Sequence, residues 1–151
     1  KISYTHISYE DDKTKRRFTT PDMGDINLTQ VYGKQRYLFG THIMSCVVKT
    51  MNIGVNQNLF GGTMLAWLDE AGFIFAQQAT SRSRMVTKCF ERVDFKAPAK
   101  VGSIVNIFCK EVLRKEKGIT VEITARCGSV EVCKTSAVYV HIDENGNSIP
   151  L

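Results

Sequence analysis

Apolar residues gather most densely between Asn56 and Ala79, where a loop rich in Asn and Gly leads into a nearly continuous hydrophobic run. The large apolar side chains of this run are Met64, Leu65, Trp67, Leu68, Phe73, Ile74 and Phe75. They are too many for one face of a surface helix, so the pattern predicts a central helix of roughly five turns that is buried on most sides. The uninterrupted run is shorter than the roughly 20 residues that a membrane-spanning helix needs.

Alternating polar and apolar positions dominate the rest of the chain and predict half-buried β-strands. Strands are expected over residues 42–51, 85–97, 103–113, 119–125 and 132–142. Gly118 and Gly128 mark hairpin turns between the last three of them. Within 85–97, strict alternation places Lys88, Arg92 and Lys96 on one face and Cys89, Val93 and Phe95 on the other.

The order strand, buried helix, four strands predicts an α+β fold in which a curved antiparallel sheet of about five to six strands wraps one long helix. A single sheet leaves one side of such a helix open, so a second copy is expected to cover it in a dimer. Residues 1–40 are polar and without sustained periodicity, and we expect a loosely ordered extension there. The folded domain is expected over 41–151.

Composition narrows the function only slightly. The chain of 151 residues has five Cys, an odd number with no C-x-x-C pair, which favours free thiols in a reducing compartment over a disulfide framework or a metal site. No signal peptide or membrane span is evident, and we expect a cytoplasmic protein, or one of an organelle matrix if a leader preceded Lys1. The net charge of +5 does not distinguish between classes of binding partner. The basic run 13–17 is interpreted as solvated surface rather than a nucleic-acid arm.

Two carboxylates, Asp69 and Glu70, interrupt the apolar run. They lie one step apart around the helix, so at least one of them points into apolar surroundings. An ionised carboxylate there is costly unless it is paired, hydrogen-bonded or facing a ligand. The pattern by itself does not choose between the two acids.

The motif L-F-G-G-T-M-L-A-W-L-D-E-A-G (59–72) resembles the hotdog-fold acyl-CoA thioesterases, in particular the YciA-like group. Shorter matches follow the same order: S-C-V-V-K-T (45–50), R-M-V-T (84–87), K-A-P-A-K-V-G-S (96–103) and V-Y-V-H-I-D-E-N-G (138–146). The resemblance implies hydrolysis of acyl-CoA to a free acid and CoA at sites formed between two subunits. It implies a homodimer at least, with a hexamer built as a trimer of dimers as the larger assembly, and no cofactor, since coenzyme A is part of the substrate.

The resemblance also implies roles for single residues. It places the catalytic acid at Asp69, with Glu70 as its neighbour. Asn56 matches one Asn of the family's loop, whereas a second such position is Gly54 in this chain, and Asn58 is a further candidate. Arg84 and Thr87 match positions that border the CoA channel. The family's small-residue cluster before the fifth strand is replaced here by K-E-K-G (115–118), a departure at the CoA-binding end.

A thioester hydrolase needs activated water or a nucleophile, and donors for the developing oxyanion. A carboxylate such as Asp69 can serve as general base or can attack directly to form an anhydride, and the sequence does not separate these routes. Backbone N–H groups of Gly61, Gly62 and Thr63 at the helix N-terminus can polarise the thioester carbonyl.

Two other functions deserve comparison with a hydrolase. A dehydratase of this fold would need a His near the acid, and no His lies in the loop before the helix. The alternative from another class is a non-catalytic acyl-CoA-binding module, which has no use for an acid in an apolar helix.

Overall fold

The computed structural model describes residues 8–10, 17–19 and 39–151. Residues 39–151 form a compact unit. In the N-terminal segment, strand β1 (Ser8–Glu10) pairs antiparallel with β2 (Arg17–Thr19). The remainder of the expected extension, up to Leu38, lies outside the described residues.

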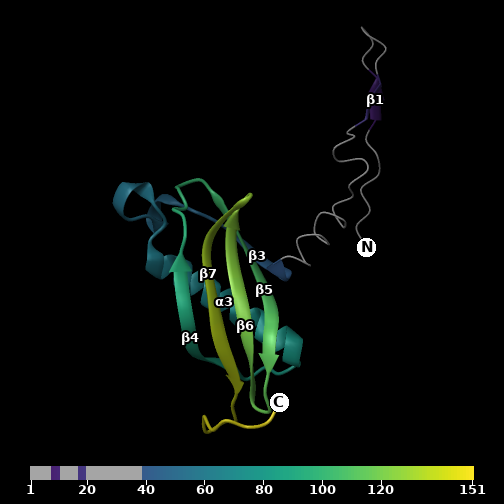
Figure 1. Ribbon diagram of the computed structural model, residues 1–151, viewed down its shortest axis with the longest axis vertical. Helices are drawn as coiled ribbons and strands as arrows, with labels where there is room; N and C mark the ends of the chain where they lie inside the picture. The colour runs from purple at the N-terminus through teal and green to yellow at the C-terminus, as the bar shows by residue number, and fades with distance from the viewer. Residues whose placement is uncertain (1–7, 11–16, 20–38) are drawn as a thin grey trace. The chain divides into compact units, whose positions relative to one another are not determined.

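Five strands of the compact unit form one antiparallel sheet (Figure 1). They are β3 (Thr41–Val47), β4 (Met85–Phe95), β5 (Ile104–Arg114), β6 (Gly118–Cys127) and β7 (Val130–His141). Their order across the sheet is β3-β5-β6-β7-β4, so β3 and β4 are the two edges. The predicted sheet is confirmed, and both predicted hairpins lie where Gly118 and Gly128 indicated.

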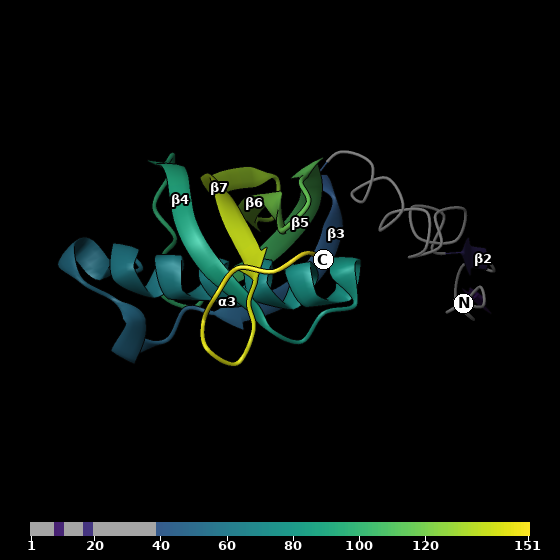
Figure 2. The ribbon, with the colours of Figure 1, turned by 90° about the horizontal axis from the view of Figure 1, so that it is seen from below.

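Helix α3 (Gly61–Thr80) lies against the concave face of this sheet, and Figure 2 shows the strands curving over it. Its buried positions are Met64, Leu68, Ala71, Gly72 and Ala76. This helical spacing forms a single stripe. The stripe packs on alternate side chains of the sheet, among them Ile107, Ile123 and Ala137, none of which is exposed to solvent. One helix and one sheet therefore share one core.

The opposite side of α3 is uncovered in the single chain. Gly62, Ala66, Glu70 and Phe73 are exposed there, and Phe73 shows 37% of its surface. One side of the helix was expected to stay open in a single copy, and these exposed residues mark that side. Among the described residues, no helix is long and apolar enough to cross a membrane.

The alternation of side chains along β4 departs from the prediction. The pairing of β4 with β7 shifts register between Thr87 and Cys89 and again between Phe90 and Arg92. Each bulge adds one residue, which moves the side chains after it to the other face, so the second bulge restores the phase that the first one shifts. Lys88 and Cys89, predicted on opposite faces, line the same surface depression.

The first predicted strand is also shorter than expected. Strand β3 ends at Val47, and two 3-10 turns, η1 (Thr50–Asn52) and η2 (Val55–Gln57), carry the chain to α3. Backbone bonds fasten this segment to the loop after β4, with the Leu59 N–H donating to the Ala99 carbonyl at 2.7 Å. The loop before α3 is thus held in a defined position.

Candidate active site

Asp69 lies on the side of α3 that faces strands β4 and β7. Its Oδ1 accepts a hydrogen bond of 2.6 Å from Thr87 Oγ1 on β4. The Tyr139 hydroxyl on β7 donates to the Asp69 carbonyl oxygen at 3.2 Å and lies 3.4 Å from Oδ1. Asp69 is half-buried, whereas Glu70 is exposed on the uncovered side of the helix. The structure therefore gives the two acids different surroundings, and Asp69 alone is held by donors from the sheet.

Tyr139 supports Asp69 from inside the core. The ring is fully buried, and burial together with the negative charge of Asp69 raises the pKa of Tyr139 well above its ordinary value. The hydroxyl therefore stays protonated and acts as a donor. The sequence analysis missed this residue, although the alternation in V-Y-V-H-I places Tyr139 on the core face and a buried Tyr needs a partner for its O–H.

Gly72 makes this contact possible. A Cβ atom built on Gly72 would lie 2.0 Å from the Tyr139 hydroxyl oxygen and 2.7 Å from Ile123 Cδ1. Both distances are far below a van der Waals contact. The helix thus approaches Tyr139 closely because position 72 has no side chain.

The N-terminus of α3 carries Gly61, Gly62 and Thr63. The first helical bond runs from the Met64 N–H to the Phe60 carbonyl at 3.1 Å, so the three preceding N–H groups have no acceptor within the helix. The N-cap residue, Phe60, provides no side-chain hydrogen bond. These amides are therefore free to bind an acceptor from a ligand.

Asp69 and the helix N-terminus are too far apart to act on one carbonyl group. Asp69 lies eight positions after Gly61, and at 1.5 Å per residue this is about 12 Å along the helix axis. A thioester bound to the amides of one chain is thus out of reach of the Asp69 carboxylate of that chain. The predicted constellation is incomplete within a single copy.

The loop before α3 places the two Asn candidates differently. Asn56 is exposed and has a left-handed backbone (φ 57°), and its carbonyl accepts a bond of 3.0 Å from Lys100 Nζ. No described hydrogen bond links its carboxamide to Asp69, so its catalytic role stays a prediction. Asn58 Oδ1, in contrast, is buried and has no hydrogen-bond partner in the described part of the chain.

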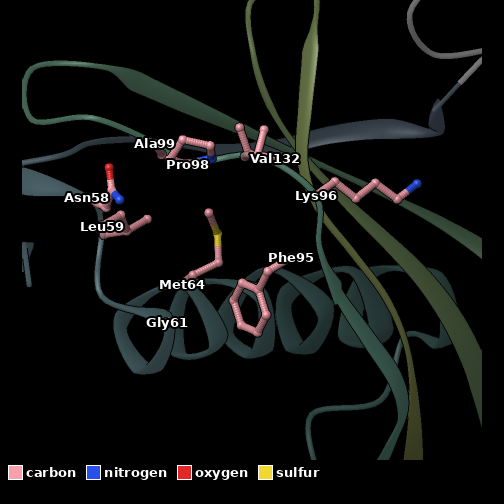
Figure 3. Close-up of a pocket in the computed structure, with 10 residues that line it drawn as sticks. Asn58, Leu59, Gly61, Met64, Phe95, Lys96, Pro98, Ala99 and Val132 are labelled. Atoms are coloured by element: carbon pink, nitrogen blue, oxygen red, sulfur yellow. The ribbon is translucent and has the colours of Figure 1, made fainter. Parts of the chain in front are cut away.

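A pocket of about 410 Å³ opens beside the helix N-terminus (Figure 3). Its lining residues are Asn58, Leu59, Gly61, Met64, Phe95, Lys96, Ala97, Pro98, Ala99 and Val132. The volume lies within the usual range of small-molecule sites. Asp69 and Thr87 do not line it, so the pocket belongs to the amide end of α3 rather than to the carboxylate.

Arg84, expected near the CoA channel, forms an exposed ion pair of 3.0 Å with Glu144. Exposed ion pairs contribute little to stability, so Arg84 can readily exchange Glu144 for another anion. Its role toward CoA stays a prediction. Over the described residues, no cluster of His, Cys, Asp and Glu could hold a metal ion.

The family model of the Thioesterase superfamily matches residues 56–134, more than half of the chain. The chain belongs to this superfamily. The match includes α3, β4, β5 and β6 and the beginning of β7, and with them Asp69, Thr87 and the helix N-terminus.

Three similar proteins place the chain more closely within the thioesterase superfamily. An uncharacterized acyl-CoA thioester hydrolase of Haemophilus influenzae is 29% identical over 131 residues, which are 81% of this chain and 83% of the relative. The acyl-CoA thioester hydrolase YciA of Salmonella typhimurium is 24% identical over 74% of this chain and 90% of its own length. A hexameric hotdog fold thioesterase of Campylobacter jejuni superposes with a TM-score of 0.63 and 27% identity, over 73% of this chain and 89% of that one. The hotdog fold is thereby confirmed.

Proposed function

We propose that this thioesterase-superfamily chain hydrolyses acyl-CoA to a free carboxylic acid and CoA. The observation that carries the proposal is the Asp69 carboxylate, held by Thr87 and backed by Tyr139 on a helix whose first amides are free. The names of the Haemophilus and Salmonella relatives point to the same substrate class. A binding module would gain nothing from this arrangement.

Asp69 would act on water or on the thioester itself. As a general base, its carboxylate takes a proton from water while the water oxygen attacks the carbonyl carbon; the C–S bond then breaks and the CoA sulfur is protonated. As a nucleophile, the carboxylate attacks the carbonyl carbon and displaces the CoA thiolate as the C–S bond breaks, and water then opens the resulting anhydride to the free acid and the Asp69 carboxylate. In both routes, the Thr87 hydroxyl fixes one carboxylate oxygen and leaves the other free to react.

The oxyanion would be stabilised by the amides of Gly61, Gly62 and Thr63. They point along the axis of α3, so the positive end of the helix dipole reinforces them. The absence of side chains at positions 61 and 62 lets a thioester approach the backbone.

A second copy would complete the site. Since about 12 Å separates Gly61 from Asp69 along the helix, the Asp69 that acts on a thioester held at one N-terminus belongs to a partner subunit. The uncovered side of α3 and the free edge of β4, where Val86 and Phe95 are exposed, are suited to such an interface. We therefore propose a homodimer at least, and the Campylobacter relative makes a hexamer the natural larger assembly.

The direct test is release of free CoA thiol from a series of acyl-CoAs of increasing chain length. We expect release of thiol and of the matching acid in equal amounts. Binding of acyl-CoA without thiol release would instead identify the non-catalytic binding module.

Thr87→Val should lower kcat/KM for butyryl-CoA by about 10- to 100-fold, because a hydrogen bond to a charged group contributes about 1.5–3 kcal/mol. The variant keeps the shape of the side chain and removes only the donor to Asp69. Thr87→Ser, which keeps the hydroxyl, should restore most of the rate. Equal activity of Thr87→Val and wild type would show that the bond does not serve catalysis.

A further inference from the structure

Among the described residues, Asn58 carries the one buried side-chain oxygen or nitrogen atom that has no hydrogen-bond partner. Its backbone is satisfied: the N–H donates to the Val55 carbonyl at 3.2 Å, and the C=O accepts from the Gly54 N–H at 2.8 Å. Its carboxamide group, in contrast, forms no hydrogen bond to any residue that the structure describes. Oδ1 is buried without a partner, and no hydrogen bond to Nδ2 is present among the described residues. A buried, unpaired carbonyl oxygen is costly, and such groups often mark a ligand contact.

The pocket around Asn58 is otherwise apolar. Figure 3 shows Asn58 and Leu59 on one wall, Met64 on the helix, and Phe95 with Val132 on the sheet side. Lys96 supplies no free charge, because its ammonium group points away from the pocket centre and forms an ion pair with Glu131. The pocket therefore offers apolar surface, one carboxamide and no uncompensated charge.

We propose that Asn58 binds a secondary amide in the thiol arm of the acyl-CoA substrate, accepting its N–H at Oδ1. The inference rests on the proposed hydrolase function and adds a substrate-binding residue to it. A trans secondary amide directs its N–H and C=O to opposite sides, so one carboxamide pairs with only one of them, and the unpaired Oδ1 requires the N–H. The amide nearest to the sulfur of coenzyme A is only two methylene groups away from it.

The other parts of the substrate fit this pocket less well. A hydrocarbon acyl chain would fill the apolar walls but leave the Asn58 carboxamide unpaired. A phosphate would meet no free cation, since Lys96 is already neutralised by Glu131. Because Gly61 lines the pocket and carries one of the amides proposed to bind the thioester, an arm leaving the thioester at that amide starts beside Asn58.

The test compares two small thioesters, S-butyryl-N-acetylcysteamine and its keto analogue, in which CH2 replaces the amide N–H. Wild type should favour the amide by roughly 10-fold in kcat/KM, as expected for one buried hydrogen bond and the acceptor left unpaired without it. Asn58→Leu should bring this ratio close to one. It should also raise the Tm, because the unpaired buried carbonyl is gone. A residue with a purely structural role would lower the Tm and leave the ratio unchanged.

Asn145→Leu is the matched control, since that carboxamide is exposed on the turn after β7. It should leave the ratio at the wild-type value. Asn58→Ala repeats the measurement should the Leu variant fail to fold. If the small thioesters react too slowly, inhibition of butyryl-CoA hydrolysis by the two free thiols replaces kcat/KM.

The outcomes separate the two proposals. A wild-type ratio near one, or a ratio that Asn58→Leu leaves unchanged, overturns the role of Asn58 while the hydrolase stands. Failure of wild type to release thiol from any acyl-CoA overturns the proposed function itself.

Discussion

Asp69→Asn should lower the rate of CoA thiol release by roughly 100- to 10,000-fold, the range that a general base contributes. Asn has the same shape and its Oδ1 still accepts from Thr87, so the fold and acyl-CoA binding should remain. What is lost is the ability to take a proton or to attack the carbonyl carbon. Steady-state kinetics with butyryl-CoA, together with the Tm and the Kd of the variant, measure the three quantities separately.

The matched control is Glu70→Gln, which neutralises the neighbouring acid on the exposed side of the helix. Its rate should stay close to that of wild type. Loss of thiol release in Glu70→Gln, with normal turnover in Asp69→Asn, would show that Glu70 is the catalytic acid and that our proposal names the wrong one. Equal, full activity in both would exclude carboxylate catalysis on α3.

The two acids also illustrate what the sequence could predict of the site. Periodicity placed both in an apolar helix but could not choose between them, because they lie one step apart around its axis. The choice depends on Thr87, 18 residues further along the chain, whose hydroxyl reaches Asp69 only after β4 has folded back along α3. The family resemblance pointed to Asp69 in advance, and its contacts with Thr87 and Tyr139 distinguish its surroundings from those of Glu70, while its catalytic role stays a prediction.

Most of the fold could be predicted because the sheet leaves a strong pattern. Alternation in β5, β6 and β7 located each strand within two residues of its observed bounds. The faces of strand β4 were harder to predict, because two bulges shift the alternation of its side chains twice within eleven residues. A bulge has no reliable sequence signal, so the face assigned to Cys89, between the two bulges, was wrong, whereas Arg92, Val93 and Phe95, after the second bulge, lie on the predicted faces.

Partners from distant segments were the hardest to predict. Tyr139 supports Asp69 from β7, 70 residues away, and Asn58 looked like any turn residue of an Asn- and Gly-rich loop. The sequence predicted that one side of α3 would need a second copy to cover it, but not which residues lie on that side. These features depend on the assembled core and not on local propensity.

Gly72→Ala should destabilise the protein and impair catalysis together. The added Cβ would lie 2.0 Å from the Tyr139 hydroxyl, in a stripe of α3 that is fully buried against the sheet. Overpacking of this kind costs about 1–3 kcal/mol and opposes the gain of up to about 1 kcal/mol that Ala gives over Gly in an unstrained helix. Because Tyr139 also holds the Asp69 backbone, its displacement should lower kcat as well.

Urea unfolding followed by circular dichroism measures the change, with Gly62→Ala as the control for stability. Gly62 belongs to the same helix, but a Cβ there would meet only the ring of Phe60, 2.9 Å away and itself exposed. That ring can rotate away, so the free energy of unfolding of Gly62→Ala should equal or slightly exceed the wild-type value. Should Gly72→Ala prove as stable as Gly62→Ala, the close approach of α3 to Tyr139 would not be the constraint that keeps Gly at position 72, and the support of Asp69 from within the core would have to be sought elsewhere.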